Sequence, residues 1–199
     1  MSNPNHPRKG SQIFVSPLTN KRLIKAIRML LEDKPRDLCL FVIGINTALR
    51  ASDLLNLKTE QVRHLPVGGV LRVHERKTKK LRNITINKSV RESLEYWLEE
   101  CDTEYLFPSQ RAEHLTVISL SKMVKRWCAI AHTTTGIKQG NLNYGSHTLR
   151  KTFGYWQRMA GVPIPVLMTI LNHESQATTL RYLGIQDTEI SDVYTELNL

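Results

Sequence analysis

The stretch VLRVHERKTKKLRNITI, residues 70–86, decides the fold class. Residues 70–74 and 82–86 alternate apolar with polar side chains, which is the pattern of a half-buried strand. The segment 75–81 that joins them is strongly basic, so we expect a β-hairpin with a charged tip. Because apolar residues recur at helical spacing on both sides of it, the chain is predicted to be a mostly helical α+β domain with one small antiparallel sheet.

Helices are expected before and after this hairpin. Thr19 can cap a first helix, and the nearly all-apolar residues 38–49 predict a buried one. Ser52 and Ser89 are the expected caps of two further helices, and residues 105–107 are expected to add a short third strand. The remaining helices are predicted at 119–131, 147–160, 163–171, 176–182 and 190–197.

Charge is distributed unevenly along the chain. The 199 residues carry 28 Lys and Arg against 18 Asp and Glu, a formal net charge of +10. Residues 1–100 hold 19 basic and 10 acidic side chains, whereas residues 101–199 hold 9 and 8. A surplus this large points to a polyanionic partner, most often nucleic acid, although a charge run by itself also fits a solvated face.

The length and composition fit one soluble domain. Residues 1–17 are polar and contain three prolines and a glycine, so we expect a flexible basic arm or linker stub before a single domain at 18–199. No apolar run approaches the roughly 20 residues that cross a bilayer, and the N-terminus lacks a secretory signal. The three cysteines are not spaced as a disulfide framework or metal site, so we expect no metal and a cytoplasmic location.

Two segments in the first half carry basic side chains suited to phosphate. In TALRASDLLNL, residues 47–57, Arg50 directly follows the expected buried helix. Its guanidinium can hold a phosphate oxygen, or it can pair with Asp53 at the helix end. In RKTKK, residues 76–80, a basic finger can deliver an ammonium group to a leaving oxygen, or simply attract phosphate.

Two later segments add histidine, arginine and tyrosine. In SHTLR, residues 146–150, the first residue can cap a helix that carries His147 and Arg150 on one face. That pair can form an anion site, although a structural histidine is the alternative. In LNHESQATTLRY, Tyr182 follows His173 by nine residues. Nearby cations would stabilise its phenolate for nucleophilic attack, but a lone tyrosine more often packs.

In order, spacing and flanking residues, these four segments resemble the catalytic domain of the tyrosine recombinase (phage integrase) family over about residues 13–197. The family's hairpin lysine falls best on Lys77, with Lys79 and Lys80 as near competitors. The catalytic set that the resemblance implies is Arg50, Lys77, His147, Arg150, His173 and the nucleophile Tyr182. Further DNA contacts are expected from Arg76, Lys79, Lys80, Arg82 and Lys151.

The resemblance implies a site-specific recombinase that cleaves and rejoins double-stranded DNA through a 3′-phosphotyrosyl intermediate. It implies no metal or other cofactor, and a homotetramer on synapsed DNA. Two alternatives use the same fold: a DNA-binding regulator that does not cleave, and a relaxer similar to a type IB topoisomerase. The complete catalytic set favours the recombinase, because a regulator that only binds DNA has no need of it.

This sequence departs from the family pattern in two places. The family segment that corresponds to LNHESQATTLRY usually has Gly before its His, whereas here Asn172 stands there and is expected to adopt a Gly-like backbone. The 17 residues before the domain cannot form the usual N-terminal core-binding domain, as in an excised fragment or a short member similar to the fimbrial-switch inverters. By resemblance the acidic tail, 183–199, is expected to dock on a neighbouring protomer, with packing on its own domain as the alternative.

Overall fold

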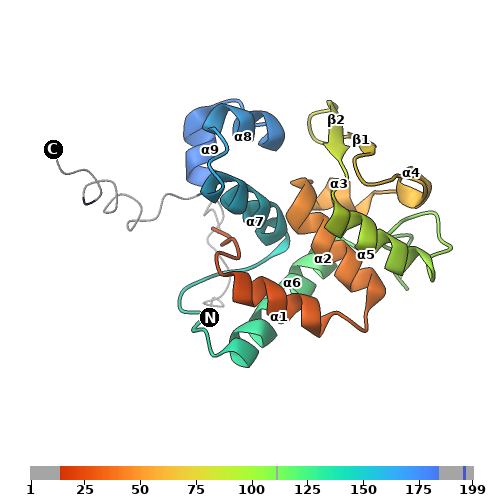
Figure 1. Ribbon diagram of the computed structural model, residues 1–199, viewed down its shortest axis with the longest axis horizontal. Helices are drawn as coiled ribbons and strands as arrows, with labels where there is room; N and C mark the ends of the chain where they lie inside the picture. Colours follow the sequence, from red (N-terminus) through yellow and green to blue (C-terminus); the bar gives the residue numbers. More distant parts are fainter. Residues whose placement is uncertain (1–13, 111, 184–194, 196–199) are drawn as a thin grey trace, which may run out of the picture.

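The structure is a computed structural model that describes residues 14–110, 112–183 and 195. Its hairpin lies where the alternation predicts it, with β1 (Val70–His74) antiparallel to β2 (Leu81–Thr85). Helices make up most of the remainder, which confirms the mostly helical α+β class (Figure 1). The described helices are α1 (Lys21–Leu30), α2 (Pro35–Thr47), α3 (Ala51–Leu55), α4 (Glu60–Arg63), α5 (Lys88–Leu98), α6 (Val117–Thr135), α7 (Ser146–Met159), α8 (Ile164–Leu171) and α9 (Gln176–Leu183).

The expected third strand at 105–107 is wrong. Tyr105 forms one isolated antiparallel bridge with Lys58, and the sheet in the described ranges has two strands. The two residues after Tyr105, Leu106 and Phe107, are fully buried in the apolar core. Pro108 then follows, and it has no N–H with which to extend a ladder. The apolar pattern of this segment therefore reports burial and not strand pairing.

Three of the expected caps are displaced by a neighbouring residue. Asn20, and not Thr19, caps α1 by accepting a hydrogen bond from the Arg22 N–H at 2.8 Å. Asn87 caps α5 in the same way through the Val90 N–H at 2.9 Å, so Ser89 lies inside that helix. Ser52 likewise lies inside α3 and not at its cap. In α1 and α5 a nearby asparagine supplies the same acceptor, whereas Arg50 at the N-cap of α3 makes no side-chain capping bond.

A large apolar core joins α1 to α7 and the inner face of the hairpin, and we call this part the helical body. The prediction of a buried helix at 38–49 is confirmed, because α2 is buried continuously from Cys39 to Gly44. It packs against α5 on one side and α7 on another. Its C-terminal end therefore has a fixed position, and the chain leaves it directly toward Arg50.

Helices α8 and α9 lie together beside α7, and we call this pair the C-terminal layer (Figure 1). A second, smaller apolar cluster supports it. The layer packs against α7, where Gly154 leaves room for Leu183, because a Cβ at that position would collide with the leucine side chain. The four buried residues of this cluster are Ala48, Leu167, Leu171 and Leu183.

The ends of the chain lie largely outside the described residues. Most of the expected arm and the tail from residue 184, apart from Thr195, therefore have no structural description here. Where the arm is described, the Ser16 N–H donates to the Asn143 carbonyl at 2.7 Å, and Leu18 is fully buried. Among the described helices, none is both long and apolar enough to cross a membrane.

Candidate active site

Arg50 reaches the site because α2 ends at Thr47, shortly before it. Ala48 has a left-handed backbone with φ 53°, which ends α2 and turns the chain into α3. The Arg50 Nη1 lies 2.6 Å from Glu75 Oε2 at the base of the hairpin. Asp53, the partner considered in the sequence, instead accepts a hydrogen bond from the Arg76 N–H at 3.0 Å.

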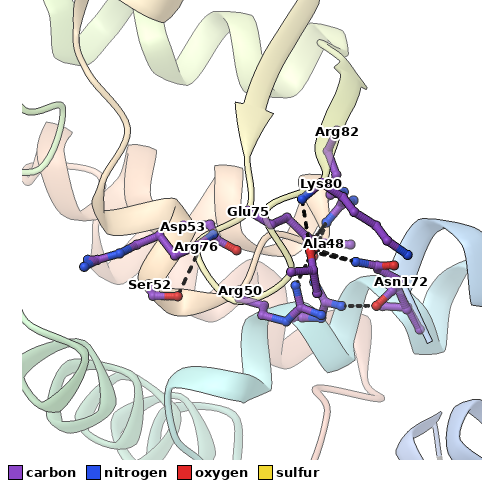
Figure 2. A network of polar contacts seen from close by, with 12 residues as sticks. Ala48, Arg50, Ser52, Asp53, Glu75, Arg76, Lys80, Arg82 and Asn172 are labelled. Atoms are coloured by element: carbon purple, nitrogen blue, oxygen red, sulfur yellow. Dashed lines mark hydrogen bonds and ion pairs between the residues drawn. The ribbon is translucent and has the colours of Figure 1, made fainter. Parts of the chain in front are cut away.

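Glu75 is the centre of this network, and sequence analysis missed it (Figure 2). Its side chain is fully buried, where its oxygens accept hydrogen bonds from Thr78 at 2.6 Å and Asn172 at 2.7 Å. Burial alone would raise the pKa of Glu75, but these hydrogen bonds and the Arg50 charge hold it at about 2. A signal was present, since Glu75 is the one acid among six basic residues between 72 and 82.

Arg150 connects the helical body to the C-terminal layer. It lies on α7, is 3% exposed, and donates to the carbonyls of Ala48 and Leu171. Burial lowers the pKa of Arg150 to about 10, so the guanidinium is still charged at neutral pH. The side chain therefore places a fixed positive charge between the end of α2 and the end of α8.

His147 precedes Arg150 by one turn of α7, as the sequence predicted. Gly145 takes the N-cap position, so the expected cap, Ser146, is the first residue of the helix instead. Desolvation lowers the pKa of His147, and the positive charges around it lower it further. These charges belong to Arg150, Lys151, Arg50 and Lys77. The imidazole is therefore neutral at pH 7.

His173 is presented by the turn between α8 and α9. Asn172, just before it, has φ 48° and ψ 53°, so the expected Gly-like backbone is confirmed. His173 Nδ1 lies 3.1 Å from Thr179 Oγ1 on α9, which fixes the ring orientation. Burial, together with the charges of Arg150 and Arg50, lowers the pKa of His173 to about 4. This second imidazole is also neutral at pH 7.

Tyr182 stands against His173 on α9, with ring centroids 5.0 Å apart and an interplanar angle of 78°. Its hydroxyl is buried, and Lys151 Nζ lies 4.9 Å from the centroid of its ring. Burial raises the pKa of Tyr182, whereas the charges of Arg150 and Arg50 act to lower it. The phenol is thus protonated, with the cations that would stabilise its phenolate already beside it.

The hairpin supplies two kinds of basic residue. Arg76, Lys77, Lys79 and Lys80 are exposed around the tip. Arg82 points inward instead, where its Nη1 donates to the Ala48 carbonyl at 3.1 Å and lies 3.3 Å from Glu75 Oε1. The tip is thus free to meet a ligand, while Arg82 belongs to the network beneath it.

The candidate residues come from four separate segments, and electrostatic interactions link them around one place. Lys77 and Arg50 act on His147, and Arg50 and Arg150 act on both His173 and Tyr182. Two fixed guanidinium groups, two neutral imidazoles and a buried phenol are suited to binding a phosphodiester and attacking it.

Several known recombinases are similar to this chain. The family model described as "Phage integrase family" matches residues 16–189. The probable integrase/recombinase YoeC of Bacillus subtilis is 35% identical over 184 residues, covering 91% of this chain and 96% of that protein. Tyrosine recombinase XerA of Pyrococcus furiosus is 28% identical over 92% of this chain, which spans only 62% of that relative.

Solved structures show the same fold. A crystal structure of XerA recombinase superposes with a TM-score of 0.71 at 22% identity, covering 94% of this chain and 66% of that one. XerH bound to a palindromic difH substrate gives a TM-score of 0.73 at 22% identity, covering 90% and 52%. The chain therefore corresponds to part of these longer proteins.

The chain belongs to the phage integrase family. It is a tyrosine recombinase, of the enzyme class that breaks and rejoins DNA strands. None of these comparisons favours the regulator that does not cleave or the topoisomerase-like relaxer.

Proposed function

We propose that this recombinase uses Tyr182 to attack a phosphate of double-stranded DNA, with Arg50 and Arg150 holding its non-bridging oxygens. The observation that carries the proposal is the burial of the Tyr182 hydroxyl beside two fixed guanidinium groups, one from the N-cap of α3 and one from α7. Such groups stabilise the charge of a phosphoryl-transfer transition state, and they also favour the phenolate.

The proposed cleavage step is a transesterification. The Tyr182 oxygen forms a bond to phosphorus, and the bond from phosphorus to the 5′ oxygen breaks. Lys77 gives a proton to that leaving oxygen, so the products are a 3′-phosphotyrosyl link and a free 5′-hydroxyl. No nucleotide is consumed, because the covalent link retains the phosphodiester energy.

The two histidines have separate parts in this proposal. His147 donates a hydrogen bond to the phosphate, as a neutral imidazole can through one ring nitrogen. His173 accepts the phenol proton, which its position against the Tyr182 ring supports. The negative phosphate offsets the Arg50 and Arg150 charges that lower the pKa of His173, so DNA binding makes it a better base.

The remaining contacts and the assembly are also part of the proposal. Exposed Arg76, Lys79 and Lys80 contact the DNA backbone, and Lys151 contributes from α7. Arg82 acts indirectly, because it supports the network beneath the tip. The enzyme works in the cytoplasm as a homotetramer on two duplexes. Leu183 packs on its own α7, so the part of the acidic tail proposed to dock on a neighbour is the segment that follows it.

The test is covalent trapping in a denaturing gel. Wild-type protein and the Tyr182→Phe variant are incubated with a pool of nicked duplexes of randomised sequence, in which the short 5′ fragment diffuses away after cleavage. Wild type should accumulate a covalent adduct, while Tyr182→Phe should bind DNA equally well and form none. Tyr194 is the other tyrosine near the C-terminus and the alternative nucleophile, so Tyr194→Phe is the matched control and should behave as wild type. An adduct formed by Tyr182→Phe would contradict the assignment.

A further inference from the structure

The side chain of Asn172 reaches across the site to the hairpin (Figure 2). Its Nδ2 donates to Glu75 Oε2 at 2.7 Å and to Thr78 Oγ1 at 3.1 Å. Asn172 caps the C-terminal end of α8 and directly precedes His173, whereas Thr78 directly follows Lys77. One amide therefore joins the segment of one candidate catalytic residue to the segment of another.

The backbone at Asn172 does not by itself explain an asparagine. Its φ of 48° and ψ of 53° lie in the left-handed region, which glycine adopts without a steric penalty from Cβ. A glycine would therefore satisfy the turn but could not make either hydrogen bond to the hairpin. The two hydrogen bonds of the amide are therefore not needed for the turn itself.

The carboxylate that accepts this hydrogen bond is that of Glu75. Glu75 Oε2 is shared by Asn172, Thr78 and Arg50, and the side chain is fully buried. When Asn172 is lost, Arg50 and Thr78 still hold Oε2, but no contact then ties the carboxylate to the end of α8. The loss therefore loosens the hairpin base, two residues before Lys77, from the C-terminal layer.

We propose that Asn172 is a positioning residue, which holds the hairpin tip against the C-terminal layer so that Lys77 and Tyr182 meet the same phosphate. This proposal rests on the proposed function, because it assigns the purpose of the contact to DNA cleavage. We call the contact between Asn172, Glu75 and Thr78 the clasp. Asn172 touches no reacting atom in this scheme and acts through the hairpin.

Two substitutions separate the clasp from the turn. Asn172→Gly keeps the left-handed backbone and removes both hydrogen bonds. Asn172→Asp keeps the shape but sets a second carboxylate against Glu75, so it should repel the hairpin. We expect cleavage of the trapping substrate to fall about 10–100-fold in the glycine variant and further in the aspartate variant, since small misplacements of reacting groups cost about that much. Binding should change by less than about twofold, because no side chain that contacts phosphate is altered.

The decisive measurement compares the cleavage rates of two substrates that differ in their leaving group. A 5′-bridging phosphorothiolate releases a thiolate that needs no proton, so it bypasses the role of Lys77. If the clasp positions Lys77, Asn172→Gly should cleave this substrate at close to the wild-type rate while remaining slow on ordinary DNA. A variant that is merely unstable would be slow on both substrates, and its melting temperature would fall.

Any other result would contradict the proposed role of the clasp. It is wrong if Asn172→Gly cleaves ordinary DNA as fast as wild type, or loses the same factor on both substrates. Equal rates for Asn172→Gly and Asn172→Asp would also contradict a direct contact with the Glu75 carboxylate. If wild type itself forms no adduct through Tyr182, the proposed function fails, and the clasp fails with it.

Discussion

The helical body and the C-terminal layer hold their parts of the site in different ways. In the body, a large apolar core fixes the end of α2 and the start of α7, from which Arg50 and Arg150 extend. In the layer, four buried apolar residues support His173 and Tyr182. The groups proposed to bind phosphate thus stand on the larger core, and the proposed nucleophile stands on the smaller one.

This difference indicates how the site is maintained before DNA arrives. Two guanidinium groups repel each other, so they need a structure that holds them in place. The body does so with Glu75 beside Arg50 and with the Ala48 carbonyl beside Arg150. The layer depends more on the contacts that join it to the body, namely Arg150, the clasp and Leu183 against α7.

The largest expected effect on cleavage comes from a substitution in the hairpin of the helical body. Lys77→Ala should lower cleavage of ordinary DNA by about 10²–10⁴-fold, the usual contribution of a general acid. Cleavage of the 5′-phosphorothiolate substrate should return to near the wild-type rate. Lys79→Ala and Lys80→Ala are the matched controls, and rescue of one of these instead would move the general acid along the hairpin.

The next effect tests the side chain that joins the two regions. Arg150→Lys keeps the charge but loses the planar fork that donates to both Ala48 and Leu171. We expect cleavage to fall about 10²–10³-fold, as when one oriented donor is removed from an active site. Arg126→Lys, an exposed position on α6, should have no effect in the same assay. Full activity of Arg150→Lys would mean that charge alone suffices.

The two cores should respond differently to cavities. Leu40→Ala in the body and Leu167→Ala in the layer each remove a fully buried side chain, and each should cost about 2–5 kcal/mol. In the body we expect this loss in the free energy of global unfolding, measured in urea. In the layer, cleavage should fall while DNA binding persists, with faster amide hydrogen exchange confined to α8 and α9. Equal loss of DNA binding in both variants would contradict two separately supported regions.

The smallest effect is a pH dependence that originates in the layer. The pKa of His173 is about 4 in the folded chain, below its ordinary value of 6.5, so the unfolded chain takes up the proton first as pH falls. The stability that neutral His173 contributes is present above pH 6.5 and is lost as pH falls toward 4. The melting temperature should therefore fall less between pH 7 and pH 4.5 in His173→Gln than in wild type. An identical fall in both proteins would contradict the lowered pKa.

The local features of the fold could be predicted from the sequence, whereas the contacts between distant segments could not. Alternation at 70–74 and 82–86 predicts the hairpin, and apolar continuity at 38–49 predicts a buried helix, because burial on one or all sides leaves a direct pattern. A helix cap depends on which of two adjacent polar residues has the extended backbone, so the sequence predicts Thr19 where Asn20 is the cap.

The network beneath the hairpin was harder to predict. Glu75 sits in a basic run that looks like a solvated surface, and nothing local shows that its side chain turns inward. Arg82 looks like its exposed neighbours, although it donates to carbonyls at the end of α2. The family pattern predicts a Gly-like backbone at Asn172, which the structure shows, but nothing local predicts the contacts of its amide. Its partners lie 97 and 94 residues away in the chain.

The most direct test of the central claim is to identify the residue that bears the DNA. Wild-type protein is trapped on the nicked duplex pool, the DNA is digested to a short nucleotide remnant, and the peptides are mapped by mass spectrometry. The account predicts a remnant joined through its 3′ phosphate to Tyr182. A remnant on Tyr194 or another side chain, or a 5′ linkage, would contradict it.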